Sequence, residues 1–233
     1  MRTAFDPASA WRRKLPEVGL FRNSVALFLV ALVLFIVAMP FAQQLAHPGL
    51  LEGPLLSAVL ICGVLAVGGR RKSLLLALGL AIPGLVARWL YFYLPDPSLQ
   101  IIALALAVLL FVLVTFQLLR FILRAPRVDS EVLSAGVATY LVLGLTWTLL
   151  YLLVAQLDPR AFSLATSAPT GPAFDGFNAL YFSFVTLTTM GYGDISPVAP
   201  VARMLAILEA VTGVLYLSVL IARLVTLYTD RQA

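Results

Sequence analysis

Residues 174–197 read FDGFNALYFSFVTLTTMGYGDISP, and this stretch decides the fold. Its first part is apolar and begins at Asp175, whose carboxylate can cap a helix running from about Gly176 to Thr188. The apolar piece 174–188 is too short to cross a bilayer, because a crossing takes about 20 residues. We therefore expect a half-helix that enters the membrane from one side and ends inside it.

The half-helix is followed by TMGYGD, residues 189–194. Gly191 and Gly193 stand at alternate positions and permit backbone angles that other residues avoid, so consecutive carbonyl groups can turn to one side. A row of carbonyls can replace the water shell of a dehydrated cation. The negative C-terminal end of the half-helix favours a cation at the same place. The stretch therefore predicts a cation site made of backbone oxygens.

The rest of the chain is strongly apolar. Of its 233 residues, 61% are hydrophobic and 12% are charged, and the mean hydropathy is +1.00. Soluble chains carry about 25% charged residues, so this composition excludes a soluble enzyme. Six runs are long and apolar enough to span a membrane: 24–41, 50–67, 73–94, 99–123, 132–155 and 201–228. We expect an all-α membrane protein with six transmembrane helices, in which the re-entrant helix lies between helices five and six.

The basic residues are distributed unevenly around these spans. A net charge of +5 raises the question of nucleic acid, but the charges lie at the ends of apolar runs, so no nucleic-acid partner is expected. With a cytoplasmic N-terminus, all 16 Lys and Arg except Arg88, Arg160 and Arg203 lie on the cytoplasmic side. The positive-inside rule then predicts a multi-pass protein of the cell membrane, embedded in the lipid bilayer, with both termini cytoplasmic. Arg88 lies within about two turns of the outer end of its span, where its side chain can reach the interface.

The run TMGYGD resembles the selectivity filter of potassium channels, Thr-Val-Gly-Tyr-Gly followed by Asp, and the resemblance covers about residues 132–230. It implies five filter residues that bind K⁺: Thr189, Met190, Gly191, Tyr192 and Gly193. Thr189 would supply its hydroxyl and its carbonyl to the innermost site, and the next three carbonyls would line the sites above. The ring of Tyr192 would pack outward against the half-helix, which corresponds to the family's pore helix. Thr188 and Asp194 would support the filter.

The chain departs from the family pattern at two positions. Met190 stands where the family usually has Val, but that side chain would point away from the ions, so K⁺ selectivity should survive. In some relatives a pore-helix Glu, four residues before the filter Thr, braces the filter. Here that position is Val185, so slow inactivation that depends on such a carboxylate is not predicted.

Glu209 is an acidic residue deep within the last span. A carboxyl at that depth must be paired, hydrated or protonated. Its carboxyl either hydrogen-bonds a neighbour and joins two helices, or braces the filter in place of the missing pore-helix carboxylate. The candidate neighbours are Trp147, Thr146 and Ser183.

Gly213 follows farther along the same span, at the place of the family's inner-helix hinge. It is either a gating hinge or a packing glycine that lets helices approach closely. Helical offsets turn three apolar residues toward a cavity below the filter: Val214, Leu217 and Ile221.

One filter motif supplies a quarter of a carbonyl ring, so a working pore requires four subunits, and we expect a homotetramer with K⁺ as the permeant ion and no cofactor. The fourth span carries only Arg120 and Arg124, both at its cytoplasmic end, so steep voltage gating is not expected. Only residues 224–233 follow Arg223, so no cytosolic ligand-sensing domain is expected.

We divide the chain into a basic cytoplasmic or interfacial N-terminus (1–23), a four-helix transmembrane domain (24–128) and a pore module (129–233). The favoured function is a K⁺-selective channel that conducts passively and is not an enzyme, since no His, Cys or carboxylate cluster lies near the bilayer surface. A less selective cation channel, an ion-transporter subunit and a non-conducting membrane scaffold are the alternatives.

Overall fold

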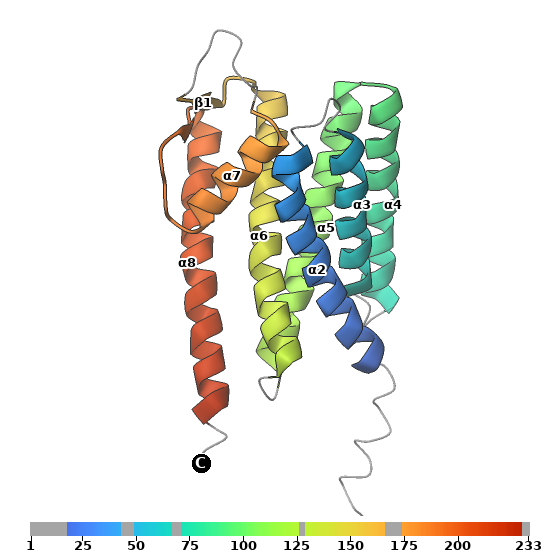
Figure 1. Ribbon diagram of the computed structural model, residues 1–233, viewed down its shortest axis with the longest axis vertical. Helices are drawn as coiled ribbons and strands as arrows, with labels where there is room; N and C mark the ends of the chain where they lie inside the picture. Colours follow the sequence, from blue (N-terminus) through green and yellow to red (C-terminus); the bar gives the residue numbers. More distant parts are fainter. Residues whose placement is uncertain (1–17, 43–48, 67–70, 126–128, 166–173, 230–233) are drawn as a thin grey trace, which may run out of the picture.

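The protein is mostly helical in its computed structural model, which describes residues 18–42, 49–66, 71–125, 129–165 and 174–229 (Figure 1). The elements follow in the order α2 (Val18–Ala42), α3 (Gly49–Ala66), α4 (Arg71–Tyr93), α5 (Pro97–Arg124), α6 (Ser130–Leu157), β1 (Phe162–Leu164), α7 (Gly176–Leu187), β2 (Ile195–Pro197) and α8 (Pro200–Thr229). The expectation of an all-α membrane protein is confirmed.

Five of the described helices, α2, α4, α5, α6 and α8, are long and apolar enough to cross a membrane. The counterpart of the second expected span is α3, whose described apolar part is the shorter Leu51–Ala66. Helix α7 has only 12 residues. The count of six spans and the re-entrant path of α7 therefore stay predictions. Helix α2 begins at Val18, ahead of the expected start, and the remainder of the N-terminal segment lies outside the described residues.

Aspartates begin three of the helices: Asp96 caps α5, Asp129 caps α6 and Asp175 caps α7. Each carboxylate accepts a hydrogen bond from an amide of the first turn, which would otherwise lack a partner. The cap at Asp175 was predicted. In the exposed loop before α5, hydrogen bonds from the hydroxyl and amide of Ser98 hold the pKa of the Asp96 carboxyl below its usual value.

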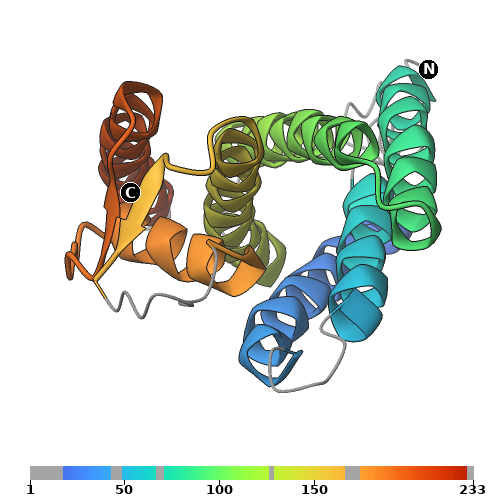
Figure 2. The same cartoon turned by 90° about the horizontal axis from the view of Figure 1, so that it is seen from above.

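Helix α6 lies in the middle of the molecule, between a four-helix bundle and the last part of the chain (Figures 1 and 2). On one side it packs against α5 and α2, and on the other it contacts α7 and α8. Within the bundle α2 packs on α3, and α4 packs on α5. The bundle α2–α5 is therefore attached to the remainder of the protein along α6.

The main hydrophobic core lies between the bundle and α6. Its fully buried residues include Phe28 of α2, Phe111 of α5 and Ala138 of α6. Half of the apolar window of α6 is buried inside the molecule, but only 17% of the window of α8. Most of the apolar surface of α8 therefore has no partner within the described part of one chain.

Two short strands, which the sequence analysis did not predict, lie beside the ends of α6 and α8. Strand β1 pairs antiparallel with β2, with Ser163 opposite Ser196. Three residues are too few to show the alternation of apolar and polar side chains that identifies a strand. The pairing connects the segment after α6 to the segment that leads into α8.

Candidate functional site

The segment that resembles a filter begins where α7 ends, and its backbone amides return to the last turns of that helix. The Thr189 amide donates to the Thr186 carbonyl at 2.9 Å. The amides of Met190 and Gly191 both donate to the Val185 carbonyl, at 3.0 and 3.3 Å. Three consecutive amides therefore face α7, and they also satisfy carbonyls that the helix end would leave unpaired.

Every second residue of this segment has a positive φ. The angles are 59° at Thr189, 56° at Gly191 and 81° at Gly193. Thr189 is the only non-glycine residue with a positive φ among the residues that the structure describes, and a β-branched residue rarely adopts it. A backbone in which every second φ is positive turns successive amides to one side of the chain, so that the carbonyls face the other side. The strained geometry at Thr189 is of the kind that clusters at functional sites.

The outer end of the segment is fastened to α7 by aromatic and polar contacts. The ring of Tyr192 stacks on the ring of Tyr181, with centroids 6.5 Å apart and planes 8° apart. The Tyr181 hydroxyl also hydrogen-bonds the Asp194 carboxylate. At the same place the Asp194 carbonyl accepts a bond from the Ala165 amide at 2.8 Å. The segment is therefore held at both of its ends.

Glu209 of α8 is 0% exposed and lies where α6, α7 and α8 meet. The Tyr151 hydroxyl lies 2.5 Å from its Oε2, and the Ser183 hydroxyl lies 2.6 Å from its Oε1. Both partners are neutral hydroxyls. The carboxyl therefore joins one residue of α6 to one residue of α7, and its hydrogen bonds go to these helices and not to the filter segment.

The hydrogens in this cluster can be counted. Ser183 Oγ lies 2.7 Å from the Gly144 carbonyl and 2.6 Å from Glu209 Oε1, yet a serine hydroxyl has one hydrogen to donate. Two arrangements of the hydrogens complete the cluster. When Glu209 is a neutral acid, it donates to Ser183 and Ser183 donates to Gly144. When Glu209 is ionised, it accepts from both Ser183 and Tyr151, and the Gly144 carbonyl still accepts from the Thr148 hydroxyl at 2.9 Å.

The predicted partners of Glu209 were partly right. Ser183 is a partner, but Thr146 donates to the Val142 carbonyl of its own helix at 2.7 Å. Sequence reasoning missed Tyr151, which lies one helical turn beyond Trp147 and therefore on the same face of α6. That spacing was the available signal, but a tyrosine near a helix end also fits a membrane-interface residue.

The C-terminal part of the chain matches known ion channels. Residues 137–230 match a family model described as ion channel. Protein LctB of Bacillus caldotenax is 30% identical over 103 residues, which cover 42% of this chain and 74% of that protein. The two pore potassium channel c of Oryza sativa subsp. japonica is 38% identical over 68 residues, 29% of this chain and 14% of that protein. A voltage-gated potassium channel of Aeropyrum pernix is 42% identical over 45 residues, which cover 19% of this chain and 15% of that protein. The chain belongs to the potassium channel family.

The match to the ion channel family model covers most of α6, all of α7, the filter segment and α8, whereas α2–α5 lie outside it. The family consists of channels and not of enzymes, as the sequence analysis expected. The chain spans 14% of the rice protein and 31% of the two-pore potassium channel 4 of Arabidopsis thaliana. No solved structure matches the chain.

Gly213 lies where α8 passes the end of α7. A Cβ added at Gly213 would collide with the backbone carbonyl of Leu187 and would also lie 3.1 Å from its side chain. Helix α8 continues unbroken through this residue from Pro200 to Thr229. Close packing against Leu187 explains why this position is a glycine. A hinge at the same residue stays a prediction.

Val214, Leu217 and Ile221, the predicted cavity residues, are all exposed along α8. Nearer its end, Arg223 was expected on the cytoplasmic side, and the structure gives it a specific contact. Its Nη2 donates to the carbonyls of Leu123 and Ala125, at 3.1 and 3.0 Å, at the C-terminal end of α5. These carbonyls lie about 100 residues away in sequence, so no local pattern could indicate the contact.

Proposed function

We propose that four copies of this chain form a pore that conducts K⁺ passively across the cell membrane and selects it over Na⁺. The observation that carries the proposal is the alternating positive φ at Thr189, Gly191 and Gly193, together with the hydrogen bonds from the amides of residues 189–191 to carbonyls of α7. This backbone leaves a row of carbonyl oxygens free for a cation.

The carbonyls of residues 189–192 would replace the water shell of K⁺, and the Thr189 hydroxyl would complete the innermost site. The C-terminal end of α7 lies directly beside the filter segment, and the negative end of its dipole favours a cation there. Contacts of Thr188 and Asp194 support the segment: the Thr188 hydroxyl donates to the Phe184 carbonyl at 2.7 Å. The protein's part in conduction is thus to hold the oxygens in place against α7.

The geometry of one filter segment supports a tetramer. Four segments around an axis are needed to enclose an ion. In the single chain Met190 and Tyr192 are 63% and 65% exposed, and α8 presents an apolar surface over most of its length. Association of four chains would cover the two exposed filter side chains and the apolar surface of α8. The purified protein should therefore have about four times the mass of the 25.2 kDa chain.

Both termini are proposed to be cytoplasmic. Arg120, Arg124 and Arg223 lie toward one end of the described helices, and Arg88, Arg160 and Arg203 toward the other, where α7 begins. When the basic residues outside the described ranges are counted as well, the first of these ends carries more Lys and Arg. The positive-inside rule places that end in the cytoplasm.

Flux in proteoliposomes with K⁺ or Na⁺ as the only cation tests the proposal. We expect K⁺ flux and little Na⁺ flux. Equal permeability to the two ions would establish the alternative, a less selective cation channel. Flux of neither ion in a verified tetramer would favour a non-conducting scaffold.

Gly193→Ala should abolish K⁺ flux and leave the tetramer intact. No atom lies within 4 Å of a Cβ added at Gly193, so the substitution acts through the backbone angle and not through a clash within the chain. A left-handed conformation costs a non-glycine residue about 1–2 kcal/mol. Gly79→Ala, in open space on α4, is the matched control and should conduct normally. Normal flux through Gly193→Ala would show that the carbonyl row is not the conduction path.

A further inference from the structure

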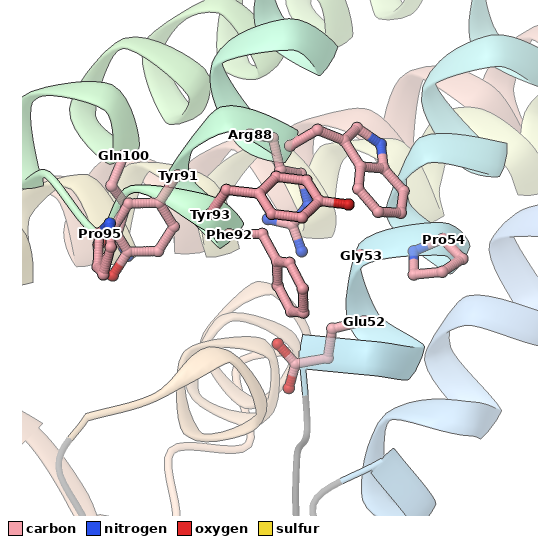
Figure 3. Close-up of a pocket in the computed structure, with 10 residues that line it drawn as sticks. Glu52, Gly53, Pro54, Arg88, Tyr91, Phe92, Tyr93, Pro95 and Gln100 are labelled. Atoms are coloured by element: carbon pink, nitrogen blue, oxygen red, sulfur yellow. The ribbon is translucent and has the colours of Figure 1, made fainter.

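A cavity of about 560 Å³ opens at the end of the bundle near the start of α7, between α3, α4 and the beginning of α5 (Figure 3). Its polar lining comes from Glu52, Arg88 and Gln100, and aromatic residues at the end of α4 supply the rest. The volume lies in the range of cavities that bind small organic groups. Neither charged residue has a role in the proposed ion path.

Arg88 is the unusual group in this cavity. Its Nε is buried and has no acceptor among the described residues, and no hydrogen bond joins its guanidinium to any of them. Leaving buried donors unpaired costs about 1–3 kcal/mol. The side chains of Arg88, Phe92 and Glu52 converge on the cavity in Figure 3. A guanidinium without a protein acceptor beside an open space indicates an anionic group in that space.

Glu52 provides the opposite charge in the same cavity. It interacts electrostatically with Arg88 without hydrogen-bonding it, and both residues line the same cavity. The sequence analysis passed over Glu52, although this residue also lies within an expected span. A ligand that matches both residues carries an acidic and a basic group a short distance apart.

The surroundings indicate that this ligand is a lipid. The cavity lies where α4 ends, on the side assigned above as external, and Trp89, Phe92 and Tyr93 on its rim are largely exposed. Exposed aromatic residues at helix ends are typical of the membrane interface, where a lipid headgroup meets its acyl chains.

We propose that this cavity binds the headgroup of a zwitterionic phospholipid of the outer leaflet, with the phosphate on Arg88 and the amine on Glu52. The inference uses the orientation given under the proposed function, and it does not depend on ion selectivity.

The cavity also reaches the pore helix. A connected space of about 260 Å³ shares Glu52, Arg88 and Gln100 with it and extends to Asp175 and Gly176 at the start of α7. The Glu52 carboxylate lies against Gly176, since a Cβ added there would be 3.5 Å from its Oε2. A bound headgroup would therefore contact the end of α7 opposite to the one that holds the filter segment.

Native mass spectrometry of the purified protein with defined lipids tests the proposal. Phosphatidylethanolamine should be retained at least about tenfold more tightly than phosphatidylglycerol, which lacks the amine, or diacylglycerol, which lacks the phosphate. Arg88→Gln and Glu52→Gln should each remove most of this preference, and Arg88→Lys should keep part of it. Arg160→Gln, an exposed outer arginine away from the cavity, is the matched control and should bind as the parent does.

Three results would overturn the inference. Equal retention of the three lipids would show that no headgroup is recognised. An unchanged preference in both Glu52→Gln and Arg88→Lys, variants that should fold, would place lipid binding elsewhere. Displacement of the lipid by free phosphoethanolamine at comparable concentration would assign the cavity to a soluble ligand. Because binding is measured without flux, a failure here is separate from a failure of K⁺ selectivity.

Discussion

Glu209 lies between two hydroxyl groups, and each of its carboxyl oxygens is within hydrogen-bond distance of one of them. Glu209→Gln should therefore be mild, because an amide can donate to Ser183 through its nitrogen and accept from Tyr151 through its oxygen. Glu209→Leu leaves the Tyr151 hydroxyl buried without an acceptor and should reduce the stability of the protein by about 1–3 kcal/mol. Thermal unfolding of the tetramer and open probability in single-channel recordings measure both effects.

Two controls define the result. Tyr151→Phe removes one hydroxyl of the cluster and should destabilise the protein, whereas Tyr140→Phe, on the same helix, removes a hydroxyl for which no hydrogen bond to another described residue is found. If Glu209→Gln were as damaging as Glu209→Leu, the arrangement with a neutral carboxyl would be excluded and the ionised one would hold. If Glu209→Leu behaved like the parent, the residue would have no bracing role.

At the scale of secondary-structure elements, the contact between α7 and α8 depends on Gly213. Gly213→Ala should destabilise the protein by about 1–3 kcal/mol, because the new methyl meets the backbone carbonyl of Leu187 and the helices must separate. Gly79→Ala, a helical glycine in open space, should be neutral or stabilising by up to about 1 kcal/mol. Thermal unfolding separates the two. A pure hinge would show the reverse pattern, with altered gating and unchanged stability.

A second contact between elements joins the end of α8 to the end of α5. Arg223→Gln should loosen it, because the charged donor on the Leu123 and Ala125 carbonyls is lost. We expect amide hydrogen exchange in the last two turns of α8 to become several-fold faster. Arg124→Gln, which changes a neighbouring exposed arginine, is the control. Equal exchange in the two variants would show that the contact does not restrain α8.

At the scale of the whole molecule, the bundle α2–α5 packs along α6 of its own chain but lacks a ladder of basic residues. In the second half of α5 the Gln117 amide instead donates to Ser73 of α4 at 2.9 Å. One charge moved through 100 mV is worth about 2.3 kcal/mol, so little charge means little voltage dependence. Open probability should change by less than about threefold over 100 mV. Recordings in planar bilayers measure this, and a change of about tenfold over 20 mV would reveal a voltage sensor.

The sequence by itself was sufficient for features that depend on neighbouring residues. Asp175 caps α7 because its carboxylate reaches an amide three residues ahead, and the glycines at 191 and 193 permit the left-handed angles found there. Runs of about 20 apolar residues indicate membrane spans, because the thickness of the bilayer sets the length of a spanning helix. Family membership also follows from this local motif.

The tertiary structure alone decided which distant residues meet. Tyr151 and Glu209 are 58 residues apart in sequence, Ser183 and Glu209 are 26 apart, and Arg223 meets a carbonyl 100 residues away. Arg88 and Glu52 share a cavity because α3 and α4 lie side by side. Such contacts depend on how helices pack, and helix packing is set by the shapes of whole faces, such as the gaps left by Gly144 and Gly213. No short pattern in the chain encodes those faces, so the hydrogen bonds of Glu209 and the cavity became visible only in the folded molecule.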